Sequence, residues 1–214
     1  MKKSLALAGI GALLSVAAYA QQEGPKVDVT LSYSFVRYNS AQTIPAFTAN
    51  GGIGTFGWNF NDHLALEAEL GGYHNGNVNN YQFDTTTFSY LFGPRISWNK
   101  AGKINPYAHI LFGGQHLATS ITKDSLLVVN PRAAALSNDH YSTATNNFAM
   151  AVGGGVDYRL TRSITIRPAQ IDYYLTRIEA INVTVPIGAT APSARNQNNF
   201  RYAAGIQFTY GGTR

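Results

Sequence analysis

The amino-acid sequence predicts an all-β protein, an eight-stranded antiparallel transmembrane up-and-down β-barrel. Three observations lead to this prediction. Apolar and polar residues alternate with a period of two in eight segments, short and long connections alternate between those segments, and the N-terminus has the pattern of an export signal. A bundle of membrane helices is excluded, because the mean hydropathy is −0.11 and no later segment has an apolar run of roughly 20 residues.

The N-terminal segment has the three parts of a secretory signal peptide. Residues 1–3 include two lysines, residues 5–16 are mainly apolar, and residues 18–20 read Ala-Tyr-Ala, a cleavage-site pattern. The apolar part is too short to span a membrane. We therefore expect cleavage after Ala20. The predicted organisation is a signal peptide over 1–20, a short periplasmic segment over 21–25, the barrel over 26–210 and a periplasmic tail over 211–214.

The composition fits an exported barrel and excludes several function classes. Charged residues make up 13% of the chain, against roughly 25% in an ordinary soluble domain. The chain has no cysteine, which excludes disulfides, thiolate metal sites and cysteine nucleophiles. Its formal charge of +5 falls to +3 without Lys2 and Lys3, since 14 basic residues then face 11 acidic ones. With no basic cluster, nucleic-acid binding is not expected.

The first four alternating segments cover residues 27–35, 53–60, 64–71 and 88–98. Because successive side chains of a strand point to opposite faces, each segment predicts a strand with one apolar and one polar face. Each is about the 9 to 11 residues that a tilted strand needs to cross a bilayer. We expect Pro94 to mark a bulge in the fourth segment, since proline has no N–H to donate to a neighbouring strand.

The last four alternating segments cover residues 107–115, 148–158, 164–175 and 200–210. The seventh changes phase in its middle, and a bulge at Pro168-Ala169 would absorb the extra residue. That bulge would keep three polar residues on one face: Arg167, Gln170 and Asp172.

Short turns and long loops alternate between these segments. The short turns are 60–63, 99–103 and 159–162, and the long polar loops are 74–85, 117–146 and 176–198. Short turns therefore gather at one end of the barrel and long loops at the other. Apolar residues inside the loops, over 126–129 and 181–187, would extend strands, cover the barrel mouth or bind a surface partner.

The polar face is predicted to line the barrel interior. An eight-stranded barrel has room only for packed side chains or one small ligand, and this face is too charged to receive an apolar ligand. Buried charges must pair, so we expect an ion-pair network that either fills the barrel or forms a gated ion path with Glu67 or Glu69 against Arg95. His109 would donate to a carboxylate of this network. The predicted members are Glu67, Glu69, Arg95, Asp157, Arg167, Asp172 and Arg201.

The apolar face carries long aromatic and branched side chains with almost no charge, which suits lipid. Its aromatic residues gather toward the ends of the segments, as in the girdles that lie at the two membrane interfaces. The predicted lipid-facing girdle comprises Trp58, Phe60, Phe88, Tyr90, Trp98, Phe148, Tyr158, Phe200, Tyr202, Phe208 and Tyr210.

Five short stretches carry a resemblance to a known family; they are 92–95, 106–109, 111–114, 152–157 and 167–173. In this order and spacing the chain resembles the small outer-membrane β-barrel family, of the OmpA/OmpX transmembrane-domain type. The resemblance implies that the insertion machinery reads a C-terminal assembly signal, to which Gly205, Phe208 and Tyr210 are similar. Two departures are Ala203, where a polar residue is usual, and the four residues that follow Tyr210.

No cofactor or metal site is predicted, because no phosphate loop or ligand spacing is present. Some eight-stranded barrels are lipid-modifying enzymes, which need a His-Ser-acid set near the outer surface. Four residues of the long loop 117–146 and its border could supply one, but they lack a rigid strand spacing, so we expect solvated loop residues and no catalysis. They are His116, Ser120, His140 and Ser142.

The sequence thus predicts a monomer in the outer membrane with both termini in the periplasm. Its expected partners are outer-membrane lipids and lipopolysaccharide, the insertion machinery, and an unidentified surface partner through the long loops. The expected role is structural or surface-interacting, or narrow, porin-like passive conduction of small solutes. The alternatives are an outer-membrane lipid hydrolase or acyltransferase and a soluble periplasmic lipocalin-like carrier.

Overall fold

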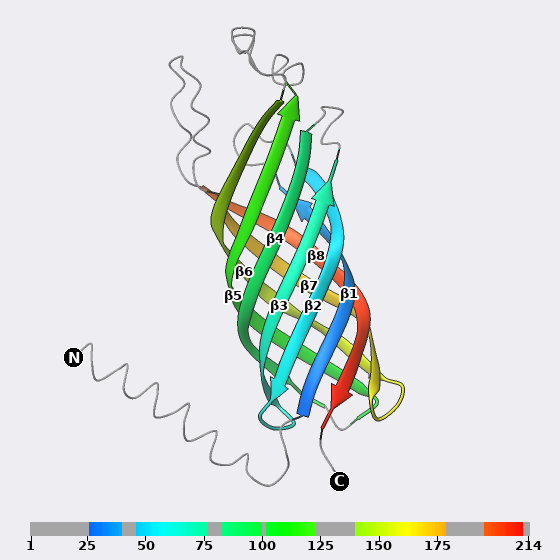
Figure 1. Ribbon diagram of the computed structural model, residues 1–214. Helices are drawn as coiled ribbons and strands as arrows, with labels where there is room; N and C mark the ends of the chain where they lie inside the picture. Colours follow the sequence, from blue (N-terminus) through cyan, green and yellow to red (C-terminus); the bar gives the residue numbers. More distant parts are fainter. Residues whose placement is uncertain are drawn as a thin grey trace, which may run out of the picture.

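The computed structural model describes residues 26–39, 46–76, 83–99, 102–122, 140–178 and 195–211. They form one closed antiparallel barrel in which each strand pairs with its neighbours in the chain and β8 pairs with β1 (Figure 1). This confirms the predicted fold. The strands are β1 (Lys26–Tyr38), β2 (Phe47–Asn59), β3 (Leu64–Asn75), β4 (Phe83–Ser97), β5 (Ile104–Thr122), β6 (His140–Arg159), β7 (Ile164–Ile178) and β8 (Arg195–Tyr210).

The short turns, the start of β1 and the end of β8 all lie at one end of the barrel, as Figure 1 shows. Two of these turns are closed by the same backbone pattern: Phe60 N–H donates to Leu64 O over 3.0 Å, and Leu160 N–H donates to Ile164 O over 3.0 Å.

The described residues contain no helix with the length and apolar character needed to span a membrane.

The strands are longer than predicted, most of all β5 with 19 residues and β6 with 20. The ends of the predicted loop, residues 117–122 and 140–146, are therefore strand. Hydropathy hides these extensions, because alternation that runs through threonine, serine, alanine and asparagine has little contrast. The expected signal peptide, segment 21–25, loop patches 126–129 and 181–187, and tail residues 212–214 lie outside the described residues.

The bulge predicted at Pro168-Ala169 is confirmed, because the register of β7 against β8 shifts between Arg167 and Gln170. Both of these side chains, like that of Asp172, are buried inside the barrel. The bulge predicted at Pro94 is wrong. Pro94 pairs in register with β3, and the register of β4 against β5 is the same on both sides of it. Its exposed ring faces outward, so the missing N–H does not shift the register.

Side chains fill the interior along the barrel. Most charged residues lie toward the short-turn end, and polar side chains such as Gln115 and Asn199 lie toward the long-loop end. An apolar cluster lies among them and contains Val36, Tyr38, Ala49, Ile53, Tyr73, Leu91, Leu111, Ala149, Ala151, Tyr174 and Ala203.

Glycine is required at position 153 of β6, where the neighbouring strand β7 comes too close to leave room for a side chain. A Cβ atom on Gly153 would lie 2.2 Å from Asp172 Oδ1 and 2.2 Å from Ile171 O. By contrast, a Cβ atom on the outward-facing Gly72 of β3 would meet nothing within 4 Å. The absence of a side chain at Gly153 therefore lets Asp172 lie flat against the barrel wall.

We predict that Gly153→Ala lowers the free energy of unfolding by about 1 to 3 kcal/mol, the usual cost of overpacking. The added methyl group would push Asp172 off the wall and separate β6 from β7. Gly72→Ala is the control and should change this free energy by less than about 0.5 kcal/mol. Urea titration of the protein refolded in detergent micelles measures both, and equal stabilities of the two variants would contradict the close approach.

Candidate functional site in the barrel lumen

Among the described residues, nine charged side chains lie inside the barrel, and none is more than 3% exposed. Seven of them are the predicted network, His109 is the histidine expected to donate to it, and the structure adds Asp28. The nine are Asp28, Glu67, Glu69, Arg95, His109, Asp157, Arg167, Asp172 and Arg201. Their inward position follows from strand alternation, because each is one of the alternate residues that form the polar face of its strand.

Arg95 joins three strands at the short-turn end of the lumen. Its Nη1 donates to Glu67 Oε1 over 2.8 Å, and its Nη2 donates to Asp28 Oδ2 over 2.7 Å. The amide of Asn59 on β2 supports this pair, since Asn59 Nδ2 donates to Asp28 Oδ2 over 2.9 Å and its Oδ1 accepts from Arg95 Nη2 over 3.1 Å. Arg95 thereby ties β4 to β1, β2 and β3.

His109 lies between two carboxylates. Its Nδ1 is 2.9 Å from Glu67 Oε2, and its Nε2 is 2.9 Å from Asp172 Oδ1. Because a carboxylate only accepts hydrogen bonds, both contacts are hydrogen bonds when both ring nitrogens carry hydrogen, which is the imidazolium form. In that form His109 is a fourth cation of the network and connects β5 to β3 and β7.

Arg201 of β8 contacts carboxylates on two other strands. Its Nη1 and Nη2 donate to the two oxygens of Glu69 over 2.5 and 3.1 Å, and its Nε donates to Asp172 Oδ2 over 2.8 Å. The Glu69 pair is bidentate, the geometry that makes arginine–carboxylate bonds strong and specific in direction.

Arg167 of β7 holds the β6 carboxylate and two glutamines. Its Nε and Nη2 donate to the two oxygens of Asp157 over 2.8 and 3.2 Å. Its Nη1 donates to Gln170 Oε1 over 3.1 Å, and its Nη2 donates to Gln207 Oε1 over 3.2 Å. The guanidinium carbon lies 4.3 Å from the centre of the Tyr107 ring, which adds a cation–π contact.

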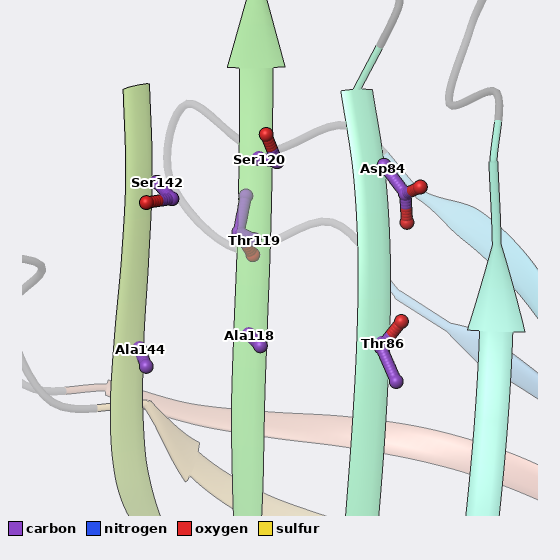
Figure 2. A pocket seen from close by; sticks show the side chains of 7 residues that line it. All are labelled: Asp84, Thr86, Ala118, Thr119, Ser120, Ser142 and Ala144. Atoms are coloured by element: carbon purple, nitrogen blue, oxygen red, sulfur yellow. The ribbon is translucent and has the colours of Figure 1, made fainter. Parts of the chain in front are cut away.

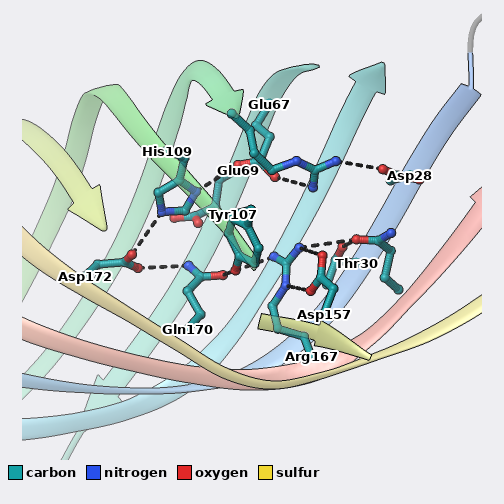
Figure 3. A network of polar contacts seen from close by, with 12 residues as sticks. Asp28, Thr30, Glu67, Glu69, Tyr107, His109, Asp157, Arg167, Gln170 and Asp172 are labelled. Atoms are coloured by element: carbon teal, nitrogen blue, oxygen red, sulfur yellow. Dashed lines mark hydrogen bonds and ion pairs between the residues drawn. The ribbon is translucent and has the colours of Figure 1, made fainter. Parts of the chain in front are cut away.

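These contacts close into a ring around the lumen, and Figure 3 shows its members from Asp28 and Glu67 through His109, Asp172 and Gln170 to Arg167. Gln170 Nε2 donates to Asp172 Oδ2 over 2.8 Å, which joins the Arg167 cluster to His109. On the other side, Gln207 Nε2 donates to Thr209 Oγ1 over 3.4 Å, and Thr209 Oγ1 donates to Asp28 Oδ1 over 2.8 Å. With Asn59 and Asp157 as branches, every strand contributes a member. We call this set the lumen ring.

The lumen ring has almost balanced charge. Its five carboxylates face three guanidinium groups and the His109 imidazolium, a formal sum of −1. Buried charges cost several kcal/mol each unless they are paired and hydrogen-bonded, and the ring supplies a partner for every charged group in it. It contains no serine or cysteine nucleophile, and among the residues that the structure describes no group of three or more acidic or histidine side chains could hold a metal ion.

The apolar cluster contacts the lumen ring inside the barrel. Its tyrosines contact the top of the ring, where the Arg201 Nη1 atom donates to the Tyr73 hydroxyl over 3.4 Å and the Arg201 guanidinium carbon lies 5.3 Å from the Tyr174 ring centre. The Tyr174 hydroxyl in turn donates to Gln115 Oε1 over 3.0 Å. Side chains therefore occupy the cross-section at successive levels.

The aromatic residues of the predicted girdle lie on the outside. Nine of the eleven are in strands, and Phe60 and Trp98 directly follow β2 and β4. Trp58, Trp98 and Tyr210 are 47%, 59% and 60% exposed. Large aromatic side chains with this exposure suit contact with lipid better than contact with water. Of the predicted assembly signal, Tyr210 is exposed, Phe208 is partly exposed, and Gly205 lies at an inward position.

The four candidates for a lipid-modifying enzyme lie on strands, not in a loop as expected. Ser120 of β5 is the register partner of Ser142 of β6, and Thr122 is the partner of His140. His116 Nδ1 lies 2.8 Å from Asn146 Oδ1. Within the described part of the chain, neither serine hydroxyl is hydrogen-bonded to a histidine, which a nucleophile–base pair requires.

Sequence reasoning missed several members of the ring. Asp28 was visible as an inward residue of the first strand, but its partner Arg95 is 67 positions away, and no local pattern links them. The linking amides of Asn59 and Gln207 carry no charge to attract notice, and Gln170 was predicted to lie inward but not to link two clusters. The apolar cluster was also missed, because Ile53, Leu91 and Leu111 lie on the face that composition marks as polar.

Comparisons with known proteins agree with this geometry. The model of the family described as outer membrane protein beta-barrel domain matches residues 5–208. The chain therefore belongs to this family, which confirms the resemblance found in the sequence. No curated protein matches the chain significantly.

Solved structures of small outer-membrane barrels share the fold. Neisserial surface protein A has a TM-score of 0.55 at 13% identity and covers 86% of this chain and 97% of its own. OprG from Pseudomonas aeruginosa has 0.55 at 12%, covering 88% and 97%. Ail, the attachment invasion locus protein of Yersinia pestis, has 0.52 at 11%, covering 87% and 99%.

We predict that Arg95→Met destabilises the barrel by about 3 to 5 kcal/mol, because it leaves Asp28 buried without its cation and Glu67 with His109 alone. Arg162→Met, in an exposed short turn, is the control and should cost less than about 0.5 kcal/mol. Urea titration in detergent micelles compares the two, and adding Glu67→Gln to Arg95→Met should recover part of the loss. No recovery would show that Arg95 acts through packing alone.

Proposed function

We propose that this outer-membrane barrel is a monomer with a closed lumen, and that its role in the cell envelope is structural and surface-interacting rather than catalytic or conductive. The observation that carries the proposal is the lumen ring, which connects all eight strands across the interior. The apolar cluster stacked on the ring supports it.

A hydrated ion that crosses this lumen has to displace paired charges. Opening a path between Glu67 and Arg95 separates groups that are 2.8 Å apart and fully buried. Breaking one such pair leaves an uncompensated buried charge, at a cost of about 3 to 5 kcal/mol. The ion would then meet Leu91, Leu111 and the tyrosines of the apolar cluster, where no charge replaces its hydration.

The surroundings of the barrel follow from its outer face. We infer that lipid surrounds the exposed aromatic and branched residues, and that both termini and the short turns lie in the periplasm after removal of residues 1–20. Two exposed arginines, Arg37 and Arg177, stand in register with aromatic residues Phe200 and Phe148. At that level they would meet the phosphates of lipopolysaccharide. Gly205, Phe208 and Tyr210 would be read by the insertion machinery during assembly.

Surface interaction is the second part of the proposal. The extended strands β4, β5 and β6 present polar side chains beyond the aromatic level, on a wall built from paired backbone. Ail, which shares the fold, carries the description attachment invasion locus protein. A shared fold transfers no partner, so the support from this chain is the rigid extension itself.

We expect the purified, refolded protein to insert into planar bilayers without discrete current steps, because the ring and the apolar cluster fill the lumen. Heat-dependent gel mobility confirms beforehand that the barrel is folded. The Glu67→Ala/Arg95→Ala double variant, which removes one positive and one negative charge together, tests gating. Steps in the wild-type protein whose size changes in this variant would overturn the proposal in favour of narrow passive conduction.

A further inference from the structure

A shallow groove lies on the outer surface of β4, β5 and β6 (Figure 2), where these strands extend beyond the aromatic level. Its volume is about 460 Å³, within the range of small-molecule sites. Two rows of register partners form it: Thr86, Ala118 and Ala144, and beyond them Asp84, Ser120 and Ser142. We call this feature the outer groove.

The outer groove has an apolar floor and a hydrogen-bonding rim. The methyl groups of Ala118 and Ala144 make the floor, and the Asp84 carboxylate and the hydroxyls of Ser120 and Ser142 stand around it. Within the described residues, the two serine hydroxyls make no hydrogen bond to protein. The small floor side chains also let a ligand come close to the sheet, and donors and acceptors remain free for it.

The position of the groove fixes the depth of its occupant in the membrane. Phe88, His116 and Asn146 form the row of register partners directly below the Thr86 row. Two residues along a strand advance by about 7 Å, so the groove begins about 7 Å along the strands from the ring of Phe88. Aromatic belts lie where the hydrocarbon meets the headgroups. The groove therefore faces the headgroup layer of the outer leaflet.

The charge of the groove selects among headgroup parts. The side chain of Asp84 is 55% exposed, and His74 Nδ1 lies 3.5 Å from its Oδ1. A carboxylate repels a phosphate but accepts hydrogen bonds from hydroxyl groups. The groove lining includes neither of the exposed arginines suited to phosphate. Arg37 is on β1, and Arg177, on β7 beside β6, is the register partner of Phe148 at the aromatic level. Hydroxyl and carboxylate groups around a methyl floor match a sugar ring, which has hydroxyls at its edge and C–H groups on its face.

We propose that the outer groove binds a headgroup sugar of an outer-leaflet glycolipid, with Ala118 and Ala144 under the ring and Asp84, Ser120 and Ser142 as hydrogen-bonding partners. This inference rests on the proposed function, because it needs the barrel to span the outer membrane. The glycolipid supplies the sugar at the right depth and in a fixed orientation, which lowers the entropic cost of binding.

The test is selective retention of lipid by the full-length mature protein in nanodiscs of phosphatidylcholine that contain a minor fraction of monoglucosyl diacylglycerol. This probe has a sugar headgroup and no phosphate. Native mass spectrometry counts the lipids that remain bound after release from the disc. We expect the glucolipid to be enriched about tenfold over its share of the disc, which corresponds to about 1.4 kcal/mol.

Two variants make the test specific. Ala118→Leu/Ala144→Leu fills the groove and should abolish the enrichment, whereas Ala68→Leu, an exposed outward position of β3, should leave it unchanged. Asp84→Asn should reduce it severalfold. Equal retention of both lipids by the wild-type protein, or full enrichment in the filled variant, would overturn the inference. A protein that fails to insert into lipid at all would instead overturn the proposed function, and heat-dependent mobility distinguishes the two failures.

Discussion

Closure of the sheet is the constraint on which the rest of the structure depends. In hydrocarbon no water can satisfy a free strand edge, so β8 has to pair with β1. Closure with eight strands leaves an interior only wide enough for side chains. The inward residues are thereby forced into contact with one another, although they come from strands far apart in the chain. The lumen ring is the consequence, because charges brought that close and removed from water must find partners.

The ring stabilises a single register more than it stabilises folding. A buried ion pair contributes little against a well-packed apolar alternative, yet removing one partner is costly. A slip of one residue in any strand would turn its inward charges toward lipid. Because the contacts join Asp28 of β1 to Thr209 of β8 as well as neighbouring strands, the penalty for a slip in one strand would extend to the others. The polar interior therefore favours one strand register over all others.

The sequence was sufficient to predict the fold, the inward charges and the aromatic outer face, because alternation is a local property. It was not sufficient to predict partners. Arg201 and Glu69 are 132 positions apart, and their contact depends on how the tilt of the strands adds up around the barrel. Strand ends were missed for a different reason. Beyond the membrane β5 and β6 consist mainly of threonine, serine, alanine and asparagine, so the contrast that reveals a strand fades while its backbone pairing continues.

The strands differ in length, so two opposite sides of the barrel are not equivalent. Among the described residues, β5 and β6 are 19 and 20 residues long, whereas β1 and β2 are 13 each. In the described part of the chain the strands are therefore longer on the side of β5 and β6 than on the side of β1 and β2. A molecule that approaches the barrel within the leaflet would meet the long polar ends of β5 and β6 on one side and the shorter strands β1 and β2 on the opposite side. A barrel with such unequal strands presents different surfaces to neighbours that approach it from different sides.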